Sequence, residues 1–191
     1  TLVFNGTLNL ASFPEGRLLG VRALARDATG NVSNLGQWGV RSDLTNPTGL
    51  QVEGADVDSI RNRWIKGDRA IEFNTHARDN QSGLARVGVE VKRGATVAAT
   101  VDRNVCPTPG SGDQPCPTGE RSENLRLNTG ELPEGNMTIA PFAVDHTGHR
   151  SAAGAGEISA SIDNTAPTID VSELSLMDND MHPAGRSRAI A

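Results

Sequence analysis

The alternation of apolar and polar residues along the chain predicts β-strands. The segment 70–77 places every second residue on one face, namely Ile71, Phe73, Thr75 and Ala77. The segment 85–92 alternates in the same way, with Val87, Val89 and Val91 on one face. A strand that buries one face needs this period of two, because successive side chains point to opposite sides of a sheet. No segment carries an apolar stripe at helical spacing over more than two turns, so the pattern predicts an all-β chain.

Five further short runs complete a set of about seven strands between residues 46 and 165. They cover residues 48–52, 95–101, 125–127, 137–139 and 157–162. Pro141 would interrupt the pairing of a central strand, so the strand that starts at Met137 is expected at a sheet edge or with a bulge. About seven short strands separated by Gly, Pro, Asn and Asp turns predict an immunoglobulin-like β-sandwich.

The chain repeats itself once, at an offset of 118 to 120 residues. The stretches that recur are 13–16 with 132–135, 25–33 with 143–151, and 43–48 with 163–168. A repeat of this length is a whole domain rather than a solenoid unit, so it predicts a tandem array of modules. Residues 1–45 are then the C-terminal half of one module and residues 46–165 are a complete one. Residues 166–191 are a linker or the start of a further module, and disorder there is an open alternative.

Composition narrows the classes of function. The net charge of −5 argues against a nucleic-acid partner, because such a partner demands a basic face. No run of about 18 apolar residues occurs, so we expect no membrane insertion. Aromatic residues make up only 3% of the chain, so aliphatic side chains must build most of the core. Trp38 aligns with Ile158 in the repeat, and we therefore expect Trp38 and Trp64 in the core rather than on a sugar-binding surface.

Three turn motifs carry a resemblance to a known family. They are Asp-Asn-Gln-Ser-Gly at 79–83, Asp-Ala-Thr-Gly-Asn at 27–31 and Asp-Asn-Thr-Ala-Pro at 163–167. In this order and spacing, residues 1 to about 170 resemble bacterial immunoglobulin-like repeat domains, which occur in tandem on secreted and surface proteins. The chain is similar to the repeats upstream of Rhs/YD-repeat regions in actinobacterial proteins. The resemblance implies an extracellular or cell-wall-associated location, with neighbouring immunoglobulin-like modules of the same chain as partners.

The two cysteines, Cys106 and Cys116, lie in one loop that is rich in Pro and Gly. We expect them to form a local disulfide, and free thiols in a reducing compartment are the alternative. Zinc is not expected, because it needs four ligands and the chain has no second pair of cysteines. A disulfide would point to an oxidising, extracellular setting.

Calcium is the metal that the sequence favours, and no other cofactor is expected. Five aspartates stand at turns and linkers, where carboxylate oxygens can bind calcium between tandem sandwiches: Asp27, Asp43, Asp79, Asp145 and Asp163. Of these, Asp79, Asp145 and Asp163 are the expected ligands. Each turn offers only one or two such oxygens, so ordinary turn chemistry is the alternative. A His-x-x-His pair follows Asp145, but the other copy of the repeat lacks both histidines. We interpret this pair as part of a solvated turn.

Enzyme motifs are missing from the sequence. The chain has no Gly-x-Ser-x-Gly elbow, no phosphate-binding glycine loop and no His-Glu-x-x-His motif. We therefore expect a non-catalytic spacer or stalk module of a secreted or cell-surface bacterial protein. The alternative is an adhesive module that binds a glycan or a protein through the loop at 102–122, because recognition residues are often carried by such loops.

Overall fold

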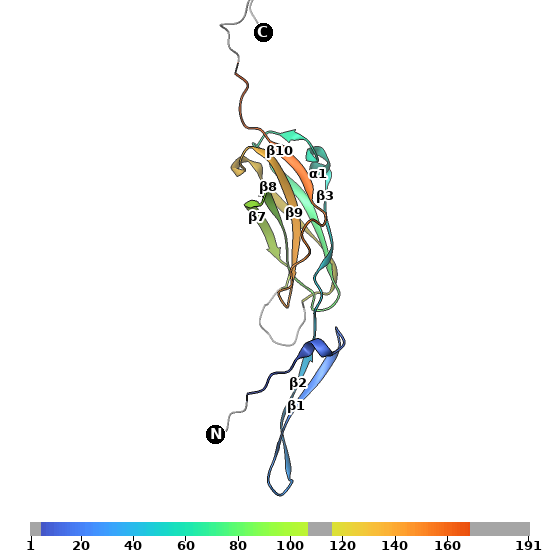
Figure 1. Cartoon of the computed structure of the whole chain (residues 1–191). Coiled ribbons are helices and arrows are strands. Elements are labelled where there is room, and N and C mark those ends of the chain that lie inside the picture. Colours follow the sequence, from blue (N-terminus) through green and yellow to red (C-terminus); the bar gives the residue numbers. More distant parts are fainter. Residues whose placement is uncertain (1–4, 107–115, 169–191) are drawn as a thin grey trace, which may run out of the picture.

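The computed structural model describes residues 5–106 and 116–168, which fold into β-sheets with little helix (Figure 1). Two sheets face each other and form a sandwich. A two-stranded hairpin precedes the sandwich in the chain and lies beyond one of its ends (Figure 1). The prediction of an all-β chain is thereby confirmed.

The strands of the three sheets are as follows. The hairpin consists of β1 (Leu18–Arg26) and β2 (Val32–Arg41). The larger sheet has the order β4-β10-β9-β6-β7, with bounds Trp64–Ile65, Ile158–Ile162, Gly135–Asp145, Leu84–Arg93 and Thr96–Asn104. The smaller sheet has the order β3-β5-β8, with bounds Thr48–Glu53, Ala70–Asp79 and Gly119–Asn128. The described helices are α1 (Ala55–Ile60) and the 3-10 turns η1 (Leu10–Ser12) and η2 (Thr129–Glu131). In this part of the chain no helix is long and apolar enough to span a bilayer.

The core of the sandwich is built from the alternating apolar residues. Ile71 and Phe73 of β5 belong to one buried cluster with Val89 and Val91 of β6, and each of the four is at most 1% exposed. Burying a side chain of this kind contributes roughly 1.5–3 kcal/mol. The cluster therefore explains why the two sheets stay together.

The sequence pattern does not predict the short helix α1. Its two buried residues, Val57 and Ile60, are fully shielded from solvent and belong to the core. The Asp56 carboxylate accepts a hydrogen bond from the backbone N–H of Glu72 at 2.9 Å and ties the helix to β5. Six residues make fewer than two helical turns, so no helical stripe can stand out from the neighbouring strands.

The strand that contains Met137 is central, so its expected position at a sheet edge is wrong. The alternative, a bulge, is not found at Pro141 either, because the register shift in the pairing with β6 lies between Leu84 and Arg86, opposite residues 144–145. This strand, β9, lies between β10 and β6. Along β9, β10 pairs with residues 135–139, whereas β6 pairs with residues as far as 145. Pro141 therefore lies beyond the β10 ladder, where its missing N–H removes no hydrogen bond to β10.

Both tryptophans are exposed, so the prediction that they fill the core is wrong. Trp38 of β2 is 55% exposed and Trp64 of β4 is 65% exposed. Trp38 lies in the hairpin, over which the described residues place no second sheet. Trp64 lies in the two-residue strand β4 at the edge of the larger sheet.

The loop that carries the cysteines is shorter than the expected 102–122. β7 extends to Asn104, which pairs with Arg86 of β6, and β8 begins at Gly119, which pairs with Asp79 of β5. The strands therefore take up both ends of the expected loop. Residues 107–115 within it, and residues 169–191 of the expected C-terminal segment, lie outside the described residues.

Candidate functional site

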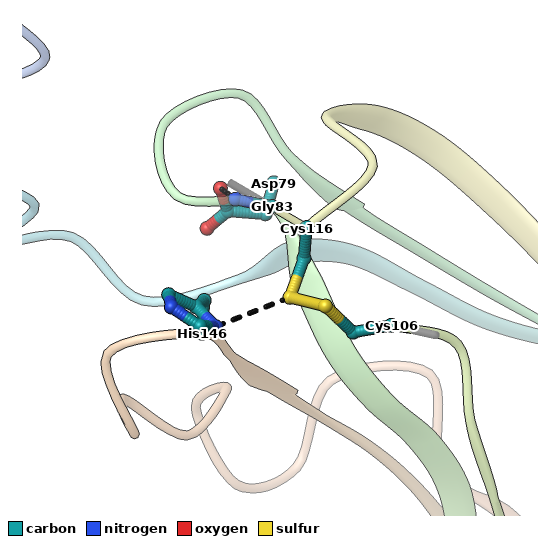
Figure 2. Close-up of a disulfide and its surroundings, with 5 residues drawn as sticks. All are labelled: Asp79, Gly83, Cys106, Cys116 and His146. Atoms are coloured by element: carbon teal, nitrogen blue, oxygen red, sulfur yellow. Dashed lines mark hydrogen bonds between the residues drawn. A yellow bond between two sulfur atoms is a disulfide. The ribbon is translucent and has the colours of Figure 1, made fainter. Parts of the chain in front are cut away.

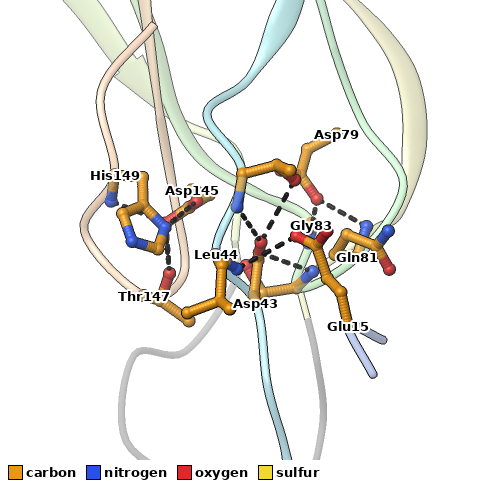
Figure 3. A network of polar contacts seen from close by, with 11 residues as sticks. Glu15, Asp43, Leu44, Asp79, Gln81, Gly83, Asp145, Thr147 and His149 are labelled. Atoms are coloured by element: carbon orange, nitrogen blue, oxygen red, sulfur yellow. Dashed lines mark hydrogen bonds and ion pairs between the residues drawn. The ribbon is translucent and has the colours of Figure 1, made fainter. Parts of the chain in front are cut away.

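Polar residues that the sequence singles out gather where the chain passes from β2 to β3 (Figure 3). Asp43 stands at the centre of this group and is only 8% exposed. Its Oδ1 accepts a hydrogen bond from the backbone N–H of Thr45 at 3.1 Å, and its Oδ2 accepts one from the backbone N–H of Ser82 at 3.1 Å. Ser82 belongs to the loop between β5 and β6. Asp43 therefore attaches the connector between β2 and β3, residues 42–47, to the sandwich. We call the contacts of residues 42–45 with Glu15 and with this loop the junction.

Glu15 closes the junction on the hairpin side. Its Oε1 accepts a hydrogen bond from the backbone N–H of Leu44 at 3.0 Å. The backbone N–H of Gly16 donates to the carbonyl oxygen of Ser42 at 2.8 Å. Because Glu15 comes before β1 and Leu44 comes after β2, these contacts join the two strands at their base.

Asp79, a candidate calcium ligand, organises the loop between β5 and β6 (Figure 3). It is 4% exposed, and its Oδ1 accepts the backbone N–H groups of Gln81 at 2.8 Å and Gly83 at 2.9 Å. An aspartate at the start of a turn commonly binds the amides that follow it. Because Asp43 binds the N–H of Ser82, three successive N–H groups of this loop donate to two carboxylates.

Asp145, a second candidate ligand, ends β9 and is 1% exposed. Its Oδ1 accepts the backbone N–H of His149 at 2.9 Å and the hydroxyl of Thr147 at 2.9 Å. Its Oδ2 lies 3.0 Å from His149 Nδ1. The histidine therefore completes the turn after β9 and does not point away from it.

The turn at Asp27, between β1 and β2, has the same construction as the turn at Asp145. Asp27 Oδ1 accepts the backbone N–H of Asn31 at 2.8 Å and the hydroxyl of Thr29 at 2.8 Å, and Oδ2 accepts the side-chain amide of Asn31 at 2.8 Å. The hydrogen bond from the Asn31 side chain, followed by that from Thr29, lowers the pKa of Asp27 from 3.8 to about 2. His149 takes the place of Asn31 in the second turn.

The surroundings of Asp43 favour its ionised form. Burial raises the pKa of this carboxyl, but hydrogen bonds from Ser82 and Thr45 and the nearby His149 outweigh burial. The pKa of Asp43 therefore lies below its usual range. The carboxylate can accept the junction hydrogen bonds throughout the neutral range.

The three candidate calcium ligands do not come together. Asp79 and Asp145 lie near the junction. Asp163 follows the last residue of β10, which pairs with the first residue of β9, whereas Asp145 is the last residue of β9. The full length of β9 therefore separates Asp163 from Asp145, and the set cannot form one site.

Asp43, which aligns with Asp163 in the repeat, is the aspartate that lies beside Asp145. Ligand atoms of Asp43, Asp145 and His149 lie within 4.8 Å of one another. Calcium prefers six to eight oxygen ligands, and two carboxylates with one imidazole offer a donor set closer to that of zinc. The carboxylate oxygens already accept hydrogen bonds from the turns around them.

Cys106 and Cys116 form a disulfide at the junction end of the sandwich (Figure 2). Their Cα atoms are 5.1 Å apart, and both side chains are buried. The backbone of Cys116 lies against Gly83, whose φ is 81°. His146 donates its backbone N–H to the carbonyl oxygen of Gly83 at 3.0 Å, and its Nδ1 lies 3.3 Å from Cys116 Sγ. The disulfide therefore closes the β7–β8 loop, and Cys116 contacts the β5–β6 loop at Gly83 and the turn after β9 at His146.

The sequence pattern groups Asp43 with the other aspartates at turns and linkers, but it does not place Glu15 in the candidate site. The repeat is the signal that could have found Glu15, since Glu15 aligns with Glu134. The contacts of Glu15 and Asp43 are hydrogen bonds between segments of the chain, which is the chemistry of a structural joint.

No protein-family model matches the chain, and no curated protein matches it.

Proposed function

We propose that this chain belongs to a tandem array of immunoglobulin-like β-sandwich modules that acts as a non-catalytic spacer or stalk. The observation that supports the proposal is a hydrogen bond that occurs at equivalent positions in both copies of the repeat. Glu15 Oε1 accepts the backbone N–H of Leu44 at 3.0 Å, and Glu134 Oε1 accepts the backbone N–H of Asn164 at 3.0 Å. The two contacts are one repeat apart in the sequence. They support two successive modules, in each of which a glutamate joins the last two strands at their base.

Asp43 and Asp163 differ in their contacts, and this difference supports a junction that forms only when another module follows. Asp43 is 8% exposed and binds Ser82 of the sandwich that follows it. Asp163, its equivalent, is exposed at the far end of that sandwich. By the repeat, a further module would offer its own equivalent of Ser82 to Asp163. A hydrogen-bonded connector of this kind supports a semi-rigid rod.

The disulfide supports a secreted or cell-surface location. Disulfides persist in oxidising compartments and are rare where cytosolic reductants act on them. The resemblance of the turn motifs to bacterial surface repeats supports the same location. The partners that we propose are the neighbouring modules of the same polypeptide.

Lengthening the chain at its C-terminal end tests the proposed rod. A second copy of residues 46–165 is joined after Thr165, so that Asp163 can meet the Ser82 equivalent of the added copy. Small-angle X-ray scattering is expected to show an elongated particle with the two sandwiches end to end. A compact particle would contradict the proposal.

Two substitutions in the first copy separate the joint from general effects of charge. Asp163→Ala is expected to widen the distribution of distances between the sandwiches, because it removes the carboxylate that would join them. Glu120→Ala is the matched control, because it removes an exposed carboxylate at the start of β8, near the other end of the sandwich. The same distance distribution for both variants would overturn the proposed joint.

A further inference from the structure

The β1–β2 hairpin presents an apolar face that the described residues cover only in part. Leu19 pairs with Val40, and Val21 pairs with Trp38, so these four side chains share one face of the hairpin. Trp38 is 55% exposed, and the other three are half-buried. A contiguous apolar patch on a small sheet marks a surface that contacts another segment or molecule.

The second copy of the repeat shows what covers the equivalent positions. There, Met137 pairs with Ala160 and Ile139 pairs with Ile158, in the same register. All four side chains are 3–4% exposed and belong to the core. The smaller sheet β3-β5-β8 faces them, and β6 pairs along the edge of β9 that β10 leaves free.

We infer that the hairpin is a docking surface for a sheet segment of the same polypeptide that precedes it and carries the pattern of β3 to β8. Among the described residues, β1 pairs with β2 along one edge only, so its other edge offers backbone N–H and C=O groups to an incoming strand. In the complete copy that strand is β6, which runs antiparallel and places Val91 opposite Ile139. The strand that docks at the hairpin therefore carries a β-branched residue opposite Val21 and further ones at every second position.

A second copy of the described chain does not fit this role. Its β6 already pairs with β9 on one edge and with β7 on the other, so β6 has no edge free for the hairpin. The strand must come from a segment that has not yet formed a complete sandwich. A preceding part of the same polypeptide meets this condition.

The test supplies the docking strands from the chain's own sequence. A copy of residues 46–131, which spans β3 to β8, is placed directly before Phe13 in the full chain and replaces residues 1–12. The chain has two tryptophans, so Trp64→Phe in both copies leaves Trp38 as the single indole. Docking is expected to shift the Trp38 emission to shorter wavelength and to reduce its quenching by acrylamide several-fold, relative to the unextended Trp64→Phe chain.

Two substitutions on the hairpin separate docking from the folding of the extension. Val21→Asp places a charge on the apolar face and is expected to abolish the shift of Trp38 emission. Gln37→Asp adds the same charge on the opposite face, where Gln37 pairs with Arg22, and is expected to keep the shift. An extension that leaves the Trp38 emission unchanged would overturn the inference, and so would equal effects of the two substitutions.

The inference rests on the repeat that also supports the proposed function, but it concerns the hairpin face and not the joint. The scattering experiment reports on the distance between sandwiches joined at Asp163. The Trp38 emission reports on the cover over the hairpin. Failure of one experiment therefore leaves the result of the other intact.

Discussion

Glu134 holds Asn164 against the base of the β9–β10 pair. Glu134 Oε1 accepts the backbone N–H of Asn164 at 3.0 Å and the hydroxyl of Thr165 at 2.8 Å. Because Glu134 precedes β9 and Asn164 follows β10, this contact closes the open end of the strand pair. Glu15 closes the β1–β2 hairpin by the same contact with Leu44.

Removal of the Glu134 carboxylate is expected to weaken the sandwich. Glu134→Ala should lower the free energy of unfolding by about 1 kcal/mol, because a backbone N–H and a hydroxyl lose their acceptor near the surface. Urea denaturation followed by circular dichroism measures the change. Glu131→Ala, an exposed carboxylate in η2, is the control and should change stability by less than about 0.5 kcal/mol. Equal losses in the two variants would contradict a specific role for Glu134.

Gly83 is expected to tolerate no side chain. Both Gly83 and Gly94 have positive φ, of 81° and 60°. An added Cβ overlaps the carbonyl of Cys116 at Gly83, whereas at Gly94 no atom of the described residues lies within 4 Å of it. Gly83→Ala should therefore cost about 2–4 kcal/mol, from backbone conformation and crowding together. Gly94→Ala should cost about 1 kcal/mol, from backbone conformation alone. Chemical denaturation of both variants decides this, and similar losses would show that the Cys116 contact is unimportant.

The disulfide is expected to contribute to stability through the loop that it closes. Cys106 and Cys116 are 10 positions apart, and in the chain-entropy model a loop of this length contributes about 2.5–3 kcal/mol. Replacing both cysteines by alanine should lower the free energy of unfolding by this amount. Reductant should destabilise the natural chain and leave the double variant unchanged. A reductant effect of the same size on both proteins would argue against the disulfide as its cause.

The Asp27 turn is expected to show a measurable shift in acidity. NMR titration of the Asp27 carboxyl should give a pKa of about 2, below the ordinary 3.8, because Asn31 and Thr29 donate hydrogen bonds to its ionised form. A lowered pKa in the folded state stabilises the turn above pH 3.8, and this stabilisation is lost as the pH falls toward 2. Asn31→Ala should move the pKa of Asp27 toward 3.8. A pKa that stays near 2 in this variant would contradict the assigned cause.

Calcium is expected to leave the melting temperature unchanged relative to EDTA. The Asp79 and Asp145 carboxylates already accept backbone N–H groups of their own loops, and Asp163 lies at the other end of β9. A bound ion would have to displace those hydrogen bonds. Thermal unfolding of the non-reduced chain measures the effect. A rise of several degrees with calcium that Asp145→Asn removes would contradict this expectation.

Strands and turns could be predicted from the sequence where the signal is local. The alternation at 70–77 and 85–92 predicts β5 and β6, and the residues expected to face inward are buried there. The pairing of Cys106 with Cys116 could be predicted because both lie in one short loop. The helix α1 could not be predicted, because its two apolar residues, Val57 and Ile60, show no helical pattern by themselves. They are buried only by contact with the core residues of the neighbouring sheets.

The candidate site could not be predicted from residues that are close together in the sequence. Asp79, Asp145 and Asp163 are alike in sequence, as acidic residues at turns, and nothing local indicates which of them meet. The pairing of β9 with β10 separates Asp163 from Asp145 by the length of a strand, and Asp43 comes from the preceding hairpin to lie beside Asp145.

The sequence by itself determined the all-β class, the period of the repeat and the turn chemistry of its aspartates, because each of these depends on residues close together in the chain. The tertiary structure alone decided which strands are central, which tryptophans are exposed and which carboxylate reaches the loop at Ser82. Those features depend on contacts between distant segments. Asp43 and Ser82 are 39 positions apart, and Trp38 is exposed because the described residues place no facing sheet over its hairpin.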